Sequence, residues 1–429
     1  MIYLLLVYLL ILFFFCCKKT EINLSNPSFY LLFGMIIAVL VAIIYQKEWN
    51  LNLHVKTFFA IALGCTIFCS VLVGVKKKKL NKSSSFIFIS DSKIVFMIFF
   101  QLVTFYMVAK IKMAQTGNLI LAEAVNETMM DSKFGNGHYS LGFWGIPSSI
   151  VSEYGYLCCA LIPLYFKYKV KRRKILLLVL SLLINMIGSL LAGGRTELLC
   201  NIVALAFFYF LFNDVKHKLK PLIIMGITAL LFISSFALLG NLIGRSENSD
   251  DPTLQVVTYG FAVYCGAEIK NLDDELEKPA KETEPFGKLT LRYIYNWYGS
   301  HFKNKALASY SDGTYFNSAG SYNLGNVFTV FHSEYIDAGL FGIIVFTLLM
   351  SFVSRMFYAL TLNSDFSLSG IPNFATIACS SMIPQVFLSF FGTNFWGWFG
   401  YWLSYKSVFI IVLLLFLYGM KIIKYHKII

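Results

Sequence analysis

Long apolar runs recur along the whole chain and are separated by short polar connections. The runs extend for about 16 to 22 residues, the length that a helix needs to cross the hydrocarbon core of a membrane. They are continuous and do not alternate with a period of two, so the pattern predicts spanning helices and not barrel strands. We place about eleven spans, with ten or twelve also compatible, at residues 2–17, 28–45, 57–75, 94–109, 148–166, 175–192, 197–213, 221–242, 338–359, 372–391 and 401–420.

One long polar segment interrupts this series between the eighth and ninth spans. Residues 243–337 hold 13 of the 23 acidic residues but 8 of the 36 Lys and Arg, a balance of −5 in a chain whose total is +13. The sequence therefore predicts an all-α polytopic membrane protein, a single membrane domain over residues 1–429 with 243–337 inserted as one large extracytoplasmic loop. We expect the charged middle of this loop, from Asp273 to Glu284, to be a solvated cover.

Composition and charge support a membrane protein. At 57% hydrophobic and 14% charged residues, the chain is too apolar for a soluble domain of this length. The basic residues cluster in alternate short connections, such as Lys76 to Lys79 and Lys167 to Lys174, so membrane topology explains the net charge better than nucleic-acid binding does. All clusters fall on one side, which predicts an N-terminus outside and a cytoplasmic C-terminus. The run 2–17 has no basic region before it and no cleavage site after it, so we interpret it as a retained helix.

Several kinds of chemistry have no signature in the chain. The nine cysteines lie mostly within apolar spans, and none has a metal-type spacing with histidine. No Walker loop, dinucleotide fingerprint or His-Glu-x-x-His motif is present. The outer loops also lack the Asp-x-Asp pattern of a metal–nucleotide-sugar site. We therefore expect no metal and no cofactor, and a lipid-linked donor suits an outer site better than a cytoplasmic nucleotide-linked one.

Three arginines fall on the predicted outer face and are candidate ligands for a pyrophosphate. Arg195 follows two glycines in a short connection, Arg245 follows the eighth span, and Arg292 lies in an aromatic stretch that includes Trp297. A guanidinium offers a planar fork to phosphate oxygens, and the helix that begins after Arg195 adds backbone N–H groups and a favourable dipole. Interfacial arginines that extend their side chains toward the lipid headgroups are the alternative interpretation.

A second cluster of candidate residues lies directly before the ninth span. His332, Glu334 and Asp337 fall within six residues of one another. His332 or Glu334 at a membrane surface can act as a general base toward a sugar hydroxyl, while a neighbouring carboxylate orients the imidazole. The alternative is that Asp337 is an ordinary helix N-terminal charge and Glu334 a solvated one.

Two segments resemble a known family. The stretch Leu191-Ala-Gly-Gly-Arg-Thr-Glu-Leu-Leu199 resembles the Gly/Ser-Arg-Thr turn of bacterial oligosaccharide repeat-unit polymerases, the O-antigen polymerase family. The stretch from Gly325 to Gly342 resembles that family's Asn-Val-Tyr-Thr pattern followed by an acidic residue and Gly-x-x-Gly, with Phe328 in place of the frequent tyrosine.

The resemblance implies a membrane glycosyltransferase of the bacterial inner membrane. Such an enzyme would join undecaprenyl-pyrophosphate-linked repeat units into O-antigen or capsule at the outer face, with the lipid carrier as part of the substrate. Arg195, Arg245 and Arg292 would contact the pyrophosphate, and His332 or Glu334 would be the base. The resemblance also implies a chain-length regulator and a flippase as partners. The alternatives are an O-antigen ligase and a lipid-linked oligosaccharide flippase or transporter. The residues expected to contact sugar or to support the local structure are Asn326, Thr329, Tyr335, Asp337 and Trp297.

Overall fold

The described part of the chain is all-α apart from one short hairpin. The computed structural model describes residues 1–75, 86–134, 140–192, 196–213, 253–278, 286–304 and 316–419. Ten of the eleven predicted spans coincide with helices, and the remaining one, 221–242, lies outside the described residues. The main helices are α1 (Ile2–Lys19), α2 (Pro27–Ile44), α3 (Val55–Leu72), α4 (Asp91–Thr116), α5 (Leu121–Phe134), α6 (Gly145–Lys167), α7 (Arg172–Ser189), α8 (Thr196–Phe212), α14 (Val330–Leu362), α16 (Phe374–Phe387), α17 (Asn394–Tyr401) and α18 (Ser407–Tyr418).

Six helices of the described chain are long and apolar enough to cross a membrane, namely α1, α2, α3, α4, α6 and α14. Shorter apolar helices cover Thr196–Phe212, Phe374–Phe390 and Ser407–Tyr418. The chain is therefore a helical membrane-embedded protein, and the total of eleven spans stays a prediction.

The described chain divides into two compact units. The first contains Met1–Lys77, Thr258–Ala359 and Met382–Tyr405, and the second contains Lys78–Val257, Leu360–Ser381 and Lys406–Ile429. Each unit joins segments that are far apart in the sequence, so long-range packing holds each of them together. The single domain over residues 1–429 stays a prediction.

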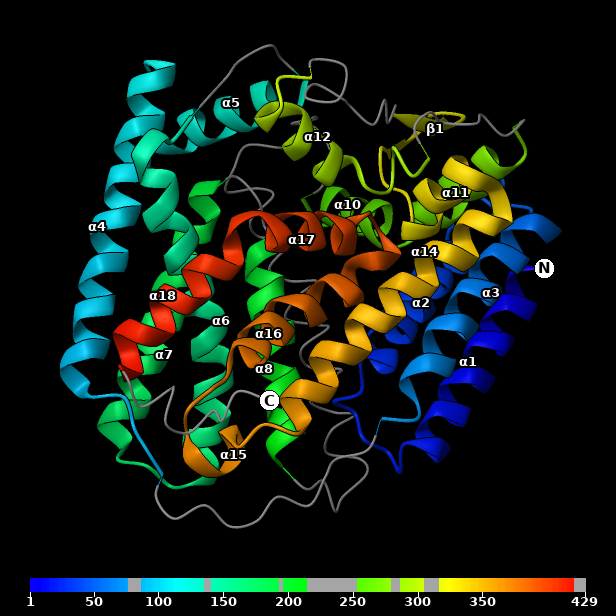
Figure 1. Cartoon of the computed structure of the whole chain (residues 1–429). Helices are drawn as coiled ribbons and strands as arrows, with labels where there is room; N and C mark the ends of the chain where they lie inside the picture. Colours follow the sequence, from blue (N-terminus) through cyan, green and yellow to red (C-terminus); the bar gives the residue numbers. More distant parts are fainter. Residues whose placement is uncertain are drawn as a thin grey trace. The chain divides into compact units, whose positions relative to one another are not determined.

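In the first unit, α1, α2 and α3 pack side by side (Figure 1). The start of α2 is defined by Pro27 at its first position and by Asn26, whose side-chain oxygen accepts the Ser28 N–H at 3.0 Å. The Asn26 amide also donates to the carbonyl of Leu72 at 3.0 Å, at the end of α3. A single polar side chain thus caps one helix and satisfies a terminal carbonyl of its neighbour.

In the second unit, α4, α6, α7 and α8 form a bundle. Asp91 at the start of α4 lies 3.4 Å from Lys174 and 3.8 Å from Arg173, which stand at the start of α7. The basic connection between α6 and α7 therefore lies at the same end as the start of α4. The ends of α4 and α7, and the starts of α6 and α8, lie at the opposite end.

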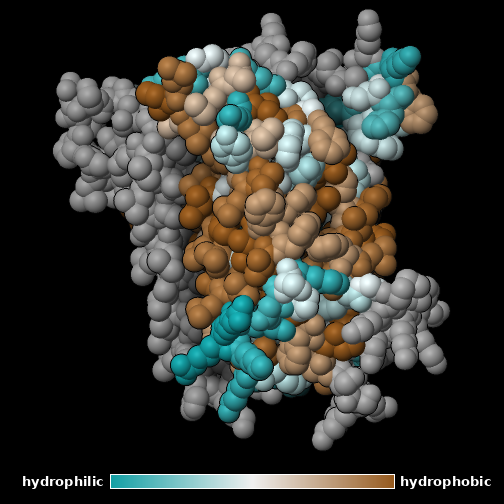
Figure 2. All heavy atoms as spheres, turned by 90° about the vertical axis from the view of Figure 1, so that its left-hand side faces the viewer, coloured by the Kyte–Doolittle hydropathy of each residue, from teal (hydrophilic) through white to brown (hydrophobic). Residues whose placement is uncertain are grey.

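The surface around α4 is the kind that a membrane requires. Figure 2 shows a broad hydrophobic belt on this face, with hydrophilic residues gathered beyond it. Exposed apolar side chains follow one side of α4 through most of its length. They are Val95, Phe96, Phe99, Leu102 and Tyr106.

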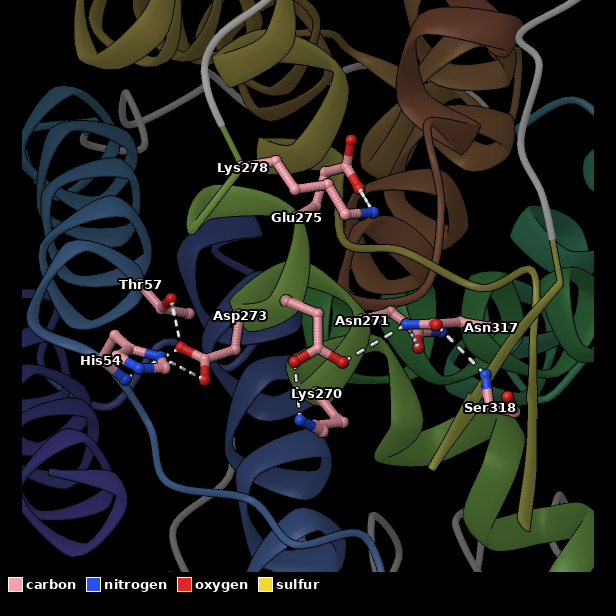
Figure 3. A network of polar contacts seen from close by, with 10 residues as sticks. His54, Thr57, Lys270, Asn271, Asp273, Glu275, Lys278, Asn317 and Ser318 are labelled. Atoms are coloured by element: carbon pink, nitrogen blue, oxygen red, sulfur yellow. Dashed lines mark hydrogen bonds and ion pairs between the residues drawn. The ribbon is translucent and has the colours of Figure 1, made fainter. Parts of the chain in front are cut away.

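The acidic segment of the long loop is folded against the first unit. It contains α10 (Thr253–Cys265) and α11 (Ala267–Leu276), and α11 packs on α2 and α3. Asp273 is 1% exposed, and its carboxylate accepts hydrogen bonds from the His54 backbone at 2.9 Å and from the Thr57 hydroxyl (Figure 3). The prediction of a solvated cover is therefore wrong for Asp273. Residues 279–284 lie outside the described residues.

The same helix holds the short hairpin in place. Strand β1 (Asn317–Ala319) pairs antiparallel with β2 (Tyr322–Gly325). The buried Asn271 amide donates to the carbonyl of Val327 at 2.8 Å. Its oxygen accepts from the Asn317 amide at 2.9 Å (Figure 3). One residue of α11 therefore fixes both the hairpin and the chain that leads into α14.

Removal of the Asp273 carboxylate should detach α11 from α3. Asp273→Ala leaves the His54 N–H and the Thr57 hydroxyl without their acceptor, and we expect a loss of about 3 kcal/mol in unfolding free energy. The measurement is denaturant unfolding of the purified protein in detergent micelles. Glu277→Gln is the control, because Glu277 is 42% exposed and pairs weakly with Lys56 at 3.7 Å. Equal unfolding free energies of the two variants would contradict the role of Asp273 in attaching α11 to α3.

A second buried carboxylate of α11, that of Glu268, lies five residues before Asp273. Glu268 is fully buried, and neither of its oxygens has a hydrogen-bond partner among the described residues. Burial raises the pKa of the Glu268 carboxyl well above its ordinary value of 4.5. The folded protein therefore binds a proton that the unfolded chain releases as the pH rises.

This proton makes stability depend on pH with a definite sign. Because the folded pKa is raised, the contribution of Glu268 is fully present below the unfolded pKa and is lost as the pH rises toward the folded value. Each pH unit in that window costs up to about 1.4 kcal/mol. Glu268→Gln mimics the protonated form, so its stability advantage over the wild type should grow from pH 5 to pH 8 in thermal unfolding. An advantage that does not change with pH would contradict this assignment.

Candidate functional site

The segment that carries the resemblance ends in a break within α14. Ala338 and Gly339 have non-helical dihedrals inside this helix, and Gly339 adopts φ 61°, ψ −147°. This combination lies close to a region that essentially only glycine occupies. The break separates a short helical segment, 330–337, from the apolar helix 340–362. His332, Glu334 and Asp337 all belong to the short segment, whereas the sequence predicted a span that begins at 338.

The short segment lies against the helix that follows it. A Cβ atom built on Gly342 would stand 2.0 Å from the backbone carbonyl oxygen of Glu334, which leaves no room for a side chain. Gly339 therefore supplies the backbone conformation, and Gly342 supplies the close approach of the two segments. These two requirements give the Gly-x-x-Gly spacing a physical explanation.

Glu334 joins three parts of the first unit. Its carboxylate is fully buried, with Oε1 accepting from Trp396 Nε1 at 3.1 Å and Oε2 accepting from the Thr347 hydroxyl at 2.9 Å. No cation among the described residues pairs with it, so these two donors compensate for the loss of water. Thr347 lies on the apolar helix after the break, and Trp396 on α17. Sequence reasoning missed both partners, although a threonine within an apolar span was an available signal.

Asp337 attaches the long loop to the same segment. Its two oxygens accept the backbone N–H groups of Leu289 at 3.0 Å and Thr290 at 2.8 Å. The carboxylate is 4% exposed. It therefore holds in place the turn that precedes α12 (Arg292–His301). Helix α12 packs on α17. This places Arg292 directly after a turn whose position Asp337 fixes.

The imidazole ring of His332 is buried within the short segment. Its ring is 8% exposed and stacks on Phe328 at a centroid distance of 4.0 Å. Nε2 is buried and has no hydrogen-bond partner among the residues that the structure describes. The hydroxyl of Thr329, also fully buried, lacks a partner within the same described set. The ring of Phe328 is thus the surface on which the imidazole packs.

The remaining predicted residues take different positions. Arg292 lies over the ring of Tyr293 at 4.9 Å, and its Nη2 donates to the Tyr293 hydroxyl at 3.2 Å. Trp297 is 40% exposed, Asn326 is exposed and Tyr335 is half-buried. Arg195 and Arg245 lie outside the described residues. Within the described set, His332, Glu334 and Asp337 lie in the short segment 330–337, and Thr329 directly precedes it.

A methyl group at position 342 should disturb this arrangement. Gly342→Ala forces the Glu334 carbonyl to move, and we expect a loss of about 1–3 kcal/mol in unfolding free energy, measured by denaturant titration in micelles. Gly145→Ala is the control, because Gly145 is helical and nothing lies within 4 Å of the position that its added methyl group would take. An unchanged midpoint for Gly342→Ala would show that the two segments do not pack as described.

Comparison with known proteins adds no relative to this description. No family model matches the chain. No curated protein matches it significantly, and no solved structure does so either. The function must therefore be argued from the residues and their geometry.

Proposed function

We propose that the chain is a membrane glycosyltransferase that polymerises undecaprenyl-pyrophosphate-linked oligosaccharide repeat units at the outer face of the bacterial cytoplasmic membrane. One observation carries the proposal. His332 lies within the segment that resembles the repeat-unit polymerases, and its Nε2 is buried without a partner among the described residues. A buried polar atom without a partner needs an explanation, and contact with a substrate supplies one.

In the proposed reaction, His332 is the general base. The neutral imidazole accepts the proton of the non-reducing-end hydroxyl of the incoming repeat unit at Nε2. The hydroxyl oxygen forms a bond to the anomeric carbon of the growing chain, and the bond from that carbon to the pyrophosphate oxygen breaks. The lipid pyrophosphate leaves with the electron pair. Arginines stabilise its developing charge, for which Arg292, Arg195 and Arg245 are the proposed residues.

The geometry ranks the two candidate bases. Both oxygens of Glu334 are engaged by Trp396 and Thr347, so this carboxylate is occupied in holding the short segment in place. We therefore assign the base to His332 and give Glu334 a positioning role. Asp337 has a similar role, because it fixes the turn before Arg292.

The test is complementation of a strain in which the gene is deleted. We expect deletion to leave surface glycan with a single repeat unit on a gel, and the wild-type gene to restore long chains. His332→Ala should fail to restore them at an unchanged protein level in membranes. His301→Ala is the matched control, because His301 lies on the exposed side of α12 and its Nδ1 is 2.8 Å from the Trp297 carbonyl.

The other outcomes are informative. Complete loss of attached repeats on deletion would point to a ligase or a flippase and would overturn the polymerase proposal. Long chains from His332→Ala at wild-type abundance would remove His332 as the base, whatever the deletion shows. Loss of chains in both histidine variants would indicate a general defect rather than a catalytic one.

A further inference from the structure

Three aromatic rings form an exposed face at the C-terminal end of α12. Trp297, Tyr298 and Phe302 fall within about 140° of the helix circumference. The rings of Tyr298 and Phe302 lie 4.4 Å apart between centroids, and these two residues are 46% and 65% exposed. Trp297 is exposed as well. Exposed apolar patches of this kind mark sites of contact with a membrane or with another molecule.

The N-terminal half of α12 is held against α17. A Cβ atom built on Gly400 would stand 2.8 Å from the Cβ of Tyr293, and one built on Gly397 would stand 3.1 Å from its ring. Two glycines of α17 therefore allow a close approach of Tyr293. The same ring packs on Tyr401 at a centroid distance of 5.2 Å. The position of α12 is thus fixed by this contact, which leaves the three rings at its other end exposed.

The turn before α12 lies against a helix that is long and apolar enough to cross a membrane. The ring of Phe286 stacks on Phe346 of α14 at a centroid distance of 5.3 Å. Phe346 stands nearly two turns into the apolar helix 340–362, about 9 Å along its axis from the first residue. Phe286 is itself exposed. The chain therefore enters α12 at the level where the apolar helix begins to meet lipid.

Exposed aromatic residues continue from α12 onto the chain that follows α17. Tyr401, which contacts Tyr293, also packs on Tyr405 at a centroid distance of 6.1 Å, and both tyrosines are exposed. Leu403 between them is exposed too. This stretch begins the predicted span 401–420, at the end that the predicted topology places outside. Tyrosine and tryptophan gather at membrane–water interfaces, so the aromatic surface has the composition of such a boundary.

The charge of this part of the loop fits the same environment. Residues 286–304 contain Lys288, Arg292 and Lys303 and no Asp or Glu, a balance of +3. The loop 243–337 as a whole totals −5, so its remainder carries −8. A helix that lies in a membrane interface combines aromatic residues, which enter the acyl boundary, with basic residues, which favour the phosphates of the headgroups. The segment around α12 has this combination within an otherwise acidic loop.

We propose that α12 is an interfacial helix whose exposed face, formed by Trp297, Tyr298 and Phe302, inserts into the headgroup region of the outer leaflet. The proposal needs only a membrane-embedded protein and does not rest on glycosyl transfer. In this arrangement Trp297 contacts lipid rather than sugar. Because Asp337 holds the turn before α12, insertion of the helix also keeps the segment 330–337 at the membrane surface.

Tryptophan fluorescence of the protein in lipid nanodiscs tests the proposal. One set of nanodiscs contains a phosphatidylcholine brominated near the headgroup end of an acyl chain, and the other contains the same lipid without bromine. We expect bromine to quench Trp297, so Trp297→Phe should lose part of the quenched emission. This change keeps an aromatic ring at an exposed position and should leave the fold intact. Trp49→Phe is the matched control, because Trp49 is fully buried and its loss should leave the quenched emission unchanged.

Iodide added to the water is the complementary quencher, and it should reach Trp297 poorly. Equal bromolipid-quenched emission from the wild type and Trp297→Phe would overturn the proposal. Strong quenching of Trp297 by iodide alone would also overturn it and would place the face in water, where a saccharide can bind. Protection from both quenchers would show that protein covers the face, with the same consequence. None of these readouts involves polymer formation, so failure of the polymerase proposal is distinguished from failure of this one.

Discussion

Burial of a carboxylate among apolar helices costs least free energy where each of its oxygens finds a donor, and Glu334 meets this condition through Trp396 and Thr347. The two hydrogen bonds require the short segment 330–337 to lie against the following helix. That approach requires Gly342, which has no space for a side chain, and the break at Gly339, whose dihedrals suit glycine. The position of His332 follows from this packing, since it lies within the same segment.

Two further carboxylates extend this arrangement into the polar loop. Asp273 attaches α11 to the start of α3, and Asp337 holds the turn before α12 through two backbone N–H groups. Each is almost fully buried, so loss of either would leave buried donors without acceptors. The described part of the loop is therefore a folded part of the first unit, attached by acidic residues that composition alone would assign to solvent.

The length and continuity of apolar runs predicted the helices well, because a membrane imposes both. The interior contacts were harder to predict. Ile269, Leu272 and Leu276 follow the period of a buried helical face, and Asp273 lies within that face. Periodicity could have predicted its burial, but charge outweighed it in the prediction of a solvated cover. The partners of Glu334 come from segments 13 and 62 residues away, and no local pattern encodes such pairs.

The second unit contains polar groups that bear on the choice between an enzyme and a flippase. Glu153 is buried and lies 3.3 Å from Lys406, and Asn185 lies within a predicted span. Intramembrane polar residues mark substrate sites in transporters and enzymes alike, so their presence does not separate the two classes. Location does separate them. Transporters place the substrate near the middle of the membrane, between related halves. The cavity of about 390 Å³ in the second unit is lined by the ends of α4 and α7 and the starts of α6 and α8, at one end of the bundle, which does not match that placement.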